Sequence, residues 1–399
     1  MSRVVITGTG LFTPEGGVTN DELVESLTTA TLRWNEDHAA EIARGECSAR
    51  DVPSSKFILR ASGVCHRYVI DKQGVLDPTR LRPRVRKRGE DELSLQAEIC
   101  VAAARDALAQ AGREGSDVDA VVVACSNLQR PYPAVAIEVQ AALGARGFAY
   151  DMNVACSSAT FAIQNVVDAL RNGHARCALV LNPELTSGHT NFELREFHFI
   201  FGDACTAVVL EREEDGATGV RVGEAWEVLG TRLATQFSNN IRNDAGFLNR
   251  CEEPAREARE LLFRQHGRQV ANEVCPMVVE HLRVHLADAG IPVGQVKRLW
   301  LHQANLNMNR TIAKTLLGRD VLPEEAPVIL DEYANTSSAG SVIAFHKHRG
   351  GIGAGEYAVL CSFGAGYSIG SVLLRKLRAA SAAISRIARA AASSSKPGQ

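Results

Sequence analysis

A cysteine lies where the sequence changes from a strand pattern to a helix pattern. The stretch Y-D-M-N-V-A over 150–155 is expected to form a short buried strand, and apolar residues then recur at helical spacing up to Gly173. Cys156 lies at this junction, so the free N–H groups of the first helical turn point toward its sulfur. That arrangement predicts a cysteine pKa below its usual ~8.5 and suits a nucleophile. The alternative is an inert, buried thiol, the commoner role of a free cysteine.

Two further polar residues lie at the ends of predicted elements. His302 follows the apolar run R-L-W-L, at the carboxyl end of a strand where ligands of α/β sheets gather. Asn335 lies in the small-residue loop E-Y-A-N-T-S-S-A-G-S-V, where it is either functional or a helix N-cap. Near the C-terminus, the turn S-F-G-A-G-Y-S-I-G around Ala365 is suited to present backbone N–H groups to an oxyanion.

The elements that must position these residues occur twice. The helix-to-strand passage ending in Cys125-Ser126-Asn127 is echoed by the passage ending in His302-Gln303-Ala304-Asn305, with Asn127 and Asn305 separated by 178 residues. The segment F-G-D-A-C-T-A-V-V-L-E is echoed by F-G-A-G-Y-S-I-G-S-V-L-L-R. Each half alternates helices with apolar strands, which predicts a layered α/β fold built from two halves, 1–215 and 216–377, followed by a low-complexity tail at 378–399. The first strand is expected at 4–6, ending in a T-G-T-G turn.

Composition narrows the class of protein. The 399 residues carry a formal net charge of -2, which gives no general attraction to nucleic acid, and no run is long enough to span a membrane. The 10 cysteines form no C-x-x-C pair, and the N-terminus lacks the apolar segment of a signal peptide, so we expect a reduced, cytoplasmic protein. His281 and His285 have the spacing of one helix face without further ligands, so no metal site is expected.

The order of these motifs resembles that of β-ketoacyl-[acyl carrier protein] synthase III, a decarboxylating condensing enzyme of the thiolase superfamily. The resemblance covers the chain from Val4 to Leu377 and rests on D-M-N-V-A-C-S-S, F-G-D-A-C-T-A-V-V-L-E, H-Q-A-N, N-T-S-S-A and F-G-A-G-Y-S-I-G. It implies a five-layered αβαβα homodimer without a cofactor. Reversible thiolases place a histidine in the loop of Asn335 and a second cysteine at Ser362, so the decarboxylative reaction is favoured.

The resemblance also implies roles for individual residues. Cys156 would accept the acyl group of an acyl-CoA, His302 and Asn335 would bind the malonyl thioester of acyl carrier protein, and the backbone N–H groups of Cys156 and Ala365 would hold an oxyanion. These implied roles extend to three groups of binding residues. They are Phe57, Arg60 and Arg195 for CoA; Arg310 and Lys314 for the carrier protein; and Tyr132, reaching across the dimer, with Ala271 for the acyl pocket.

Ala271 stands where the family often has a phenylalanine, which leaves room for an acyl primer longer than acetyl, of medium chain length. The expected function is therefore the condensation of an acyl-CoA primer with malonyl-[acyl carrier protein] in fatty acid biosynthesis. Three alternatives stay open: head-to-head condensation of two acyl-CoAs, a condensing enzyme of secondary metabolism, and a non-catalytic acyl-binding subunit.

Overall fold

Two similar α/β halves form the computed structural model, which describes residues 2–213 and 224–378. In this part of the chain nine strands form one sheet in the order β11-β12-β13-β8-β1-β7-β6-β4-β5. The strands of the first half are β1 (Arg3–Phe12), β4 (Ala120–Ala124), β5 (Phe148–Met152), β6 (Cys177–Glu184) and β7 (Ala204–Glu213). Those of the second are β8 (Trp226–Ser238), β11 (Val296–Leu301), β12 (Tyr357–Gly364) and β13 (Gly366–Lys376).

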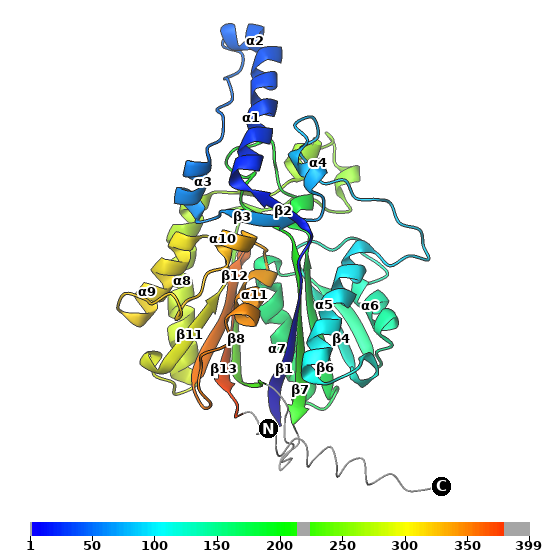
Figure 1. Cartoon of the computed structure of the whole chain (residues 1–399), viewed down its shortest axis with the longest axis vertical. Helices are drawn as coiled ribbons and strands as arrows, with labels where there is room; N and C mark the ends of the chain where they lie inside the picture. Colours follow the sequence, from blue (N-terminus) through cyan, green and yellow to red (C-terminus); the bar gives the residue numbers. More distant parts are fainter. Residues whose placement is uncertain (1, 214–223, 379–399) are drawn as a thin grey trace.

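Six helices cover the two parts of this sheet. They are α5 (Leu95–Ala111), α6 (Val135–Leu143), α7 (Ser158–Arg171), α8 (Gly267–Asp288), α9 (Leu306–Leu317) and α11 (Ala339–Lys347). Figure 1 shows α5 and α6 on one outer side, α8 and α9 on the other, and α7 and α11 between the two parts. Three separate apolar cores fill the spaces between these layers.

The duplication predicted from the sequence is visible in the strand order. The order β1-β7-β6-β4 of the first half corresponds to β8-β13-β12-β11 of the second, and β1 meets β8 through only two residue pairs, one of them Ile6 with Trp226. Helix, sheet, helix, sheet and helix layers therefore follow one another, which confirms the five-layered thiolase-like fold. The division at 215/216 falls in a segment outside the described residues, as does nearly all of the predicted tail, so both stay predictions.

The prediction of a glycine turn after residue 6 was wrong, because β1 continues to Phe12. Gly8 and Gly10 instead let α5 lie directly against the strand. A Cβ atom on Gly8 would come 2.1 Å from the backbone oxygen of Ala107, and one on Gly10 would come 2.0 Å from that of Ala103. The glycines of T-G-T-G thus serve helix packing rather than chain reversal.

Smaller elements stand above the sheet. They are β2 (Gly16–Thr19), α1 (Asn20–Asp37), α2 (Ala39–Ala43), α3 (Ser55–Ser62), β3 (His66–Val69), α4 (Lys72–Leu76), β9 (Ile241–Arg242), β10 (Arg264–Gln265) and α10 (Leu330–Tyr333). The distal part of α1, together with α2, projects from the body of the molecule (Figure 1). Helices α3, α8 and α9 border the cavity described below.

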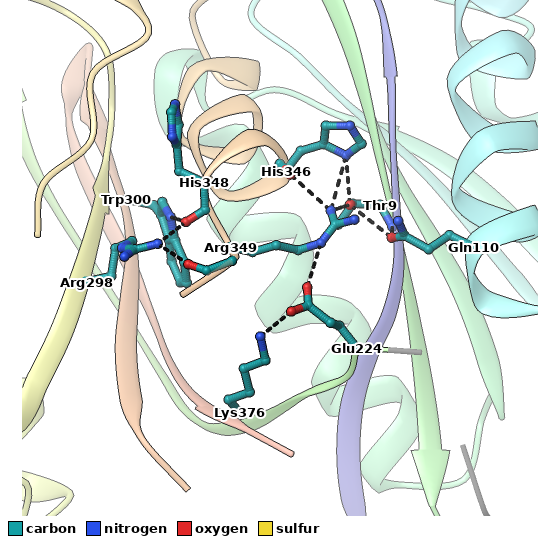
Figure 2. A network of polar contacts seen from close by, with 10 residues as sticks. Thr9, Gln110, Glu224, Arg298, Trp300, His346, His348, Arg349 and Lys376 are labelled. Atoms are coloured by element: carbon teal, nitrogen blue, oxygen red, sulfur yellow. Dashed lines mark hydrogen bonds and ion pairs between the residues drawn. The ribbon is translucent and has the colours of Figure 1, made fainter. Parts of the chain in front are cut away.

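A polar network joins the two halves at the far end of α11. Arg349 donates from Nη1 to Thr9 Oγ1 at 2.5 Å and from Nε to Glu224 at 3.1 Å, while Glu224 also pairs with Lys376 of β13 (Figure 2). His346 Nδ1 lies 2.8 Å from the same Thr9 hydroxyl, and burial lowers the pKa of His346 to about 4. The network ties β1 of the first half to α11 and β13 of the second.

Candidate active site

Cys156 is held in a tight turn between β5 and α7. A short 3-10 turn, Ala155–Ser157, separates the two elements, and Ala155 adopts a left-handed φ of 46°. Asn153 Oδ1 accepts from the Ala155 N–H at 2.8 Å, and the Ser158 hydroxyl donates to the Ala155 carbonyl at 2.7 Å. These bonds end the strand three residues earlier than the sequence suggested, and they fix the backbone that carries the sulfur.

The predicted lowering of the Cys156 pKa was wrong. Burial raises the pKa of the Cys156 thiol to about 11, and the nearby Glu184 carboxylate adds to the rise. The Ser337 hydroxyl, 3.5 Å from the sulfur, and the backbone N–H groups of Ala365 and Cys156 oppose it. Desolvation of a thiolate therefore outweighs the donors that converge on the sulfur. The thiol is protonated at neutral pH until a reaction removes its proton.

His302 follows β11 directly, as the sequence predicted. Its backbone N–H donates to the Cys361 carbonyl at 2.8 Å, and its ring meets Phe363 edge-on with a centroid separation of 5.3 Å. Burial lowers the pKa of His302 to about 4, so the imidazole is neutral at pH 7. Within residues 2–213 and 224–378, its buried Nδ1 has no hydrogen-bond partner.

Asn335 lies in the loop between α10 and α11. Its backbone N–H donates to the Ile200 carbonyl at 3.0 Å, and its carbonyl accepts from Gly202 at 3.1 Å, which docks the loop on the first half. Its side-chain oxygen accepts from the Ser337 N–H at 2.9 Å. Ser338, rather than Asn335, stands at the N-cap position of α11.

One cavity brings the three predicted residues together. Cys156, His302 and Asn335 all line a cavity of ≈ 460 Å³, and Ala271 of α8 lines it as well. Most of the remaining wall is apolar, with Phe199, Phe201, Phe263, Val270 and Phe363 among its residues. The volume is typical of a site for a small organic ligand.

Two further residues near the sulfur were not singled out in the sequence. Glu184, buried at the end of β6, accepts from the Ser126 hydroxyl at 2.5 Å and from the Ser338 N–H at 3.0 Å, and the Ser338 hydroxyl donates to it too. It thereby joins the loop after β4 to the start of α11. The signal that could have identified Glu184 in the sequence is a single acidic residue at the end of an apolar strand. Ser337, whose hydroxyl lies 3.5 Å from the sulfur, is the second of these residues.

Two of the three residues predicted to contact CoA lie together. Phe57 and Arg195 both line a small pocket of ≈ 150 Å³ near the main cavity, and Phe57 meets Phe199 edge-on at 6.2 Å. Arg195 pairs with Asp51 at 2.8 Å. Arg60 is exposed on α3 and lines neither this pocket nor the main cavity.

Three residues predicted to contact the carrier protein or the acyl chain do not line the main cavity, whereas Ala271 does: they are Arg310, Lys314 and Tyr132. Arg310 is exposed on α9, and Lys314, one turn later, pairs with Asp320 at 2.7 Å. Neighbouring residues of α9, Asn307 and Thr311, line the main cavity. Tyr132 is 81% exposed and does not line that cavity in its own chain.

The two histidines weighed as metal ligands have another partner. His281 Nε2 and His285 Nδ1 lie 2.9 and 2.7 Å from the hydroxyl of Ser371, and burial lowers the pKa of both rings to about 4. Across 2–213 and 224–378, no three histidine, cysteine or acidic side chains are grouped as a metal site would require. In the same ranges, no helix has both the length and the apolar character of a membrane span.

Comparison with known proteins decides the family. The profile of 3-oxoacyl-[acyl-carrier-protein (ACP)] synthase III matches residues 150–225, and that of its C-terminal part matches 286–376. The β-ketodecanoyl-[acyl-carrier-protein] synthase of Pseudomonas aeruginosa is 56% identical over 353 residues, which cover 88% of this chain and 100% of the relative. The chain belongs to the 3-oxoacyl-[acyl-carrier-protein] synthase III family.

A further relative carries the same family name, and a solved structure shares the fold. The β-ketoacyl-[acyl-carrier-protein] synthase III of Bordetella petrii is 29% identical and covers 94% of this chain and 98% of its own. The crystal structure of 3-oxoacyl-[acyl-carrier-protein] synthase III from Aquifex aeolicus superimposes with a TM-score of 0.71, covering 94% of this chain and 100% of that one at 24% identity. This member of the synthase III family is a condensing acyltransferase of fatty acid biosynthesis, and the family uses acyl-CoA and acyl carrier protein substrates.

Proposed function

We propose that this synthase transfers a medium-chain acyl group, octanoyl, from CoA to Cys156 and condenses it with malonyl-[acyl carrier protein]. The observation that carries the residue roles is the single cavity wall shared by Cys156, His302 and Asn335. No cofactor takes part in the proposed reaction. The primer thioester loses CoA, and the malonyl carboxyl group leaves as carbon dioxide.

The primer length is inferred from a relative. The P. aeruginosa enzyme is named for a β-ketodecanoyl product, which has ten carbons. Decarboxylative condensation adds two carbons from the malonyl group, so such a product requires an eight-carbon primer. Ala271, small and on the cavity wall, leaves space that a large side chain would fill. These two points support octanoyl rather than acetyl as the primer.

The first half-reaction loads the primer. The sulfur of Cys156 attacks the thioester carbonyl, its proton passes to the departing CoA sulfur, and the bond from the acyl carbon to that sulfur breaks. The backbone N–H groups of Cys156 and Ala365, which oppose the rise in the Cys156 pKa, would hold the oxyanion of the tetrahedral intermediate.

The second half-reaction forms the carbon–carbon bond. Carbon dioxide leaves the malonyl thioester, and its thioester oxygen becomes an enolate held by His302 and Asn335. The enolate carbon attacks the acyl carbonyl on Cys156 and releases the thiolate. A neutral imidazole is suited to this role, because with a pKa of about 4 the ring donates a hydrogen bond from its one N–H and lacks the acidic second proton that would quench the carbanion.

The remaining contacts are assigned as proposals. Phe57 and Arg195, which share a small pocket, would pack against the CoA adenine, with Arg60 on the same side. Exposed Arg310 and Lys314 on α9 would meet the acidic carrier protein. Tyr132, largely exposed, would close the acyl pocket of a partner subunit in a homodimer.

Mass spectrometry of the intact protein tests the proposal. Octanoyl-CoA should leave one octanoyl group on Cys156, acetyl-CoA should load at least tenfold more slowly, and the Cys156→Ser variant should give no thioester adduct. Addition of carboxyl-labelled malonyl-[acyl carrier protein] to the loaded enzyme should release labelled carbon dioxide. Condensation without that release would favour head-to-head joining of two acyl-CoAs, and absence of any adduct would favour a non-catalytic acyl-binding role.

A further inference from the structure

The hydroxyl of Ser337 is directed at the sulfur of the nucleophile. It donates to Cys156 Sγ at 3.5 Å, and among the residues that the structure describes it makes no other hydrogen bond. Serine hydroxyls in loops ordinarily bond nearby backbone groups. The neighbouring Ser157 and Ser158 follow this rule, since their hydroxyls donate to backbone carbonyls. The Ser337 hydroxyl therefore differs from its neighbours in having the reacting atom as its partner.

The backbone of Ser337 has an uncommon conformation. Its φ is 47°, in the left-handed region that residues other than glycine rarely adopt. The Ser337 N–H donates to Asn335 Oδ1 at 2.9 Å, and the Ser337 carbonyl accepts from the Gly340 N–H at 3.3 Å. Such strain persists only where the surrounding structure fixes it, and it is concentrated at active sites. The strain indicates that the placement of this side chain matters for the chemistry.

Ser337 also connects the residues of the site with one another. Besides its bonds to Cys156 and Asn335, its backbone acts on the His302 ring, where a hydrogen bond opposes the lowering of the His302 pKa by burial. Ser337 lines a second cavity of ≈ 530 Å³ that also borders Cys156, whereas His302 and Asn335 line only the first. A malonyl thioester bound beside His302 and Asn335 in the proposed reaction therefore leaves the Ser337 hydroxyl in place.

We propose that Ser337 is a catalytic residue whose hydroxyl stabilises negative charge on the Cys156 sulfur in both half-reactions. This inference rests on the proposed function. During loading, the Cys156 proton passes to the CoA sulfur while the new bond to the acyl carbon forms, and the hydroxyl donates to the charge that develops on the Cys156 sulfur. During condensation, the bond from the acyl carbon to Cys156 breaks, and the hydroxyl donates to the departing thiolate, which then takes up a proton from water. Ser337 keeps its own proton throughout.

The Ser337→Gly variant separates this role from a structural one. Glycine removes the hydroxyl and adopts a φ of 47° without strain, so the denaturant midpoint should stay close to that of wild type. Octanoyl loading of Cys156, followed by mass spectrometry, should nevertheless fall about tenfold, because a hydrogen bond to a charged group is lost. Ser337→Ala keeps the backbone strain and should load as slowly as Ser337→Gly. Ser116→Ala, which removes an exposed hydroxyl, is the matched control and should load like wild type.

Two further measurements distinguish the hydroxyl from the loop that carries it. Decarboxylation of malonyl-[acyl carrier protein], assigned to His302 and Asn335, should stay within threefold of wild type in both Ser337 variants. Alkylation of Cys156 by iodoacetamide should be slower than in wild type at each pH from 7 to 10, because the thiolate has lost a donor and its pKa rises further. A purely structural role for Ser337 predicts neither the selective loss of loading nor the slower alkylation.

Three outcomes overturn the inference. Octanoyl loading within twofold of wild type in a folded Ser337→Gly would show that the hydroxyl does not act on the sulfur. An equal fall in loading and in decarboxylation would show that the loop has moved, which accounts for both losses without the hydroxyl. Absence of any adduct on the wild-type protein would overturn the proposed function together with this inference, whereas equal loading of wild type and Ser337→Gly would leave the proposed function standing.

Discussion

The approach of Gly364 to Cys156 gives a sharp test of how the nucleophile is placed. Gly364 ends β12, and a Cβ atom added to it would lie 2.6 Å from the Cβ and 2.9 Å from the sulfur of Cys156. Ordinary carbon contacts are ~3.5–4.0 Å, so Gly364→Ala must move the sulfur or the strand by about 1 Å. A displacement of that size costs about a hundredfold in rate when it misaligns reacting atoms.

The expected result is a loss confined to acyl transfer. Loading of Cys156 by octanoyl-CoA should fall about a hundredfold in Gly364→Ala, while decarboxylation of malonyl-[acyl carrier protein], assigned to His302 and Asn335, should fall less than tenfold. Gly294→Ala is the matched control, because nothing lies within 4 Å of its added Cβ and its φ is not left-handed. Loading is followed by mass spectrometry, and circular dichroism shows whether each variant folds. Loading within twofold of wild type in a folded Gly364→Ala would refute the reasoning.

Three other changes test the rest of the site. Because burial raises the pKa of Cys156 to about 11, its thiolate fraction should grow about tenfold per pH unit from 7 to 10. The rate of alkylation by iodoacetamide should rise in proportion and reach no plateau in this range. A plateau below pH 8 would instead support a pKa lowered by the helix. Asn335→Ala should slow malonyl decarboxylation about 10²–10³-fold and leave octanoyl loading within threefold, measured in separate half-reactions. Glu184→Ala leaves the donors of Ser126 and Ser338 unpaired and should lower the free energy of unfolding by about 3 kcal/mol. Glu184→Gln should cause a smaller loss. An unchanged denaturant midpoint in Glu184→Ala would contradict this role.

Periodicity and duplication were enough to predict the layers and the elements that carry the site. Cys156 and His302 could be placed at element ends because a strand pattern stops near each of them. The end of such a pattern can be recognised from the sequence alone. The length of β1 could not be predicted, since glycine is common both in turns and where a helix packs closely on a strand. Only the position of α5 shows which of the two roles Gly8 and Gly10 have. The same limit explains why the left-handed turn at Ala155 was missed.

The electrostatics of the site depend on burial, which the sequence does not specify. The N–H donors that lower the Cys156 pKa belong to Ala365 and to Cys156 itself rather than to the first turn of α7, and the sign of the pKa change follows from how completely the thiolate is removed from water. Glu184 shows the same limit: its partners Ser126 and Ser338 come from distant parts of the chain, and no local pattern connects them.

The wall of the first cavity contains no lysine or arginine among the described residues, and this has a consequence for the response to salt. In the proposed reaction, negative charge on the thioester oxygen would be met there by oriented N–H groups and by a neutral imidazole, which mobile ions outside the protein screen little. Arg310 and Lys314, in contrast, lie in solvent within reach of such ions. Rising ionic strength should therefore weaken capture of the carrier protein, seen as a higher KM, while kcat stays nearly constant. The chemistry and the docking step are thus separable by sodium chloride alone.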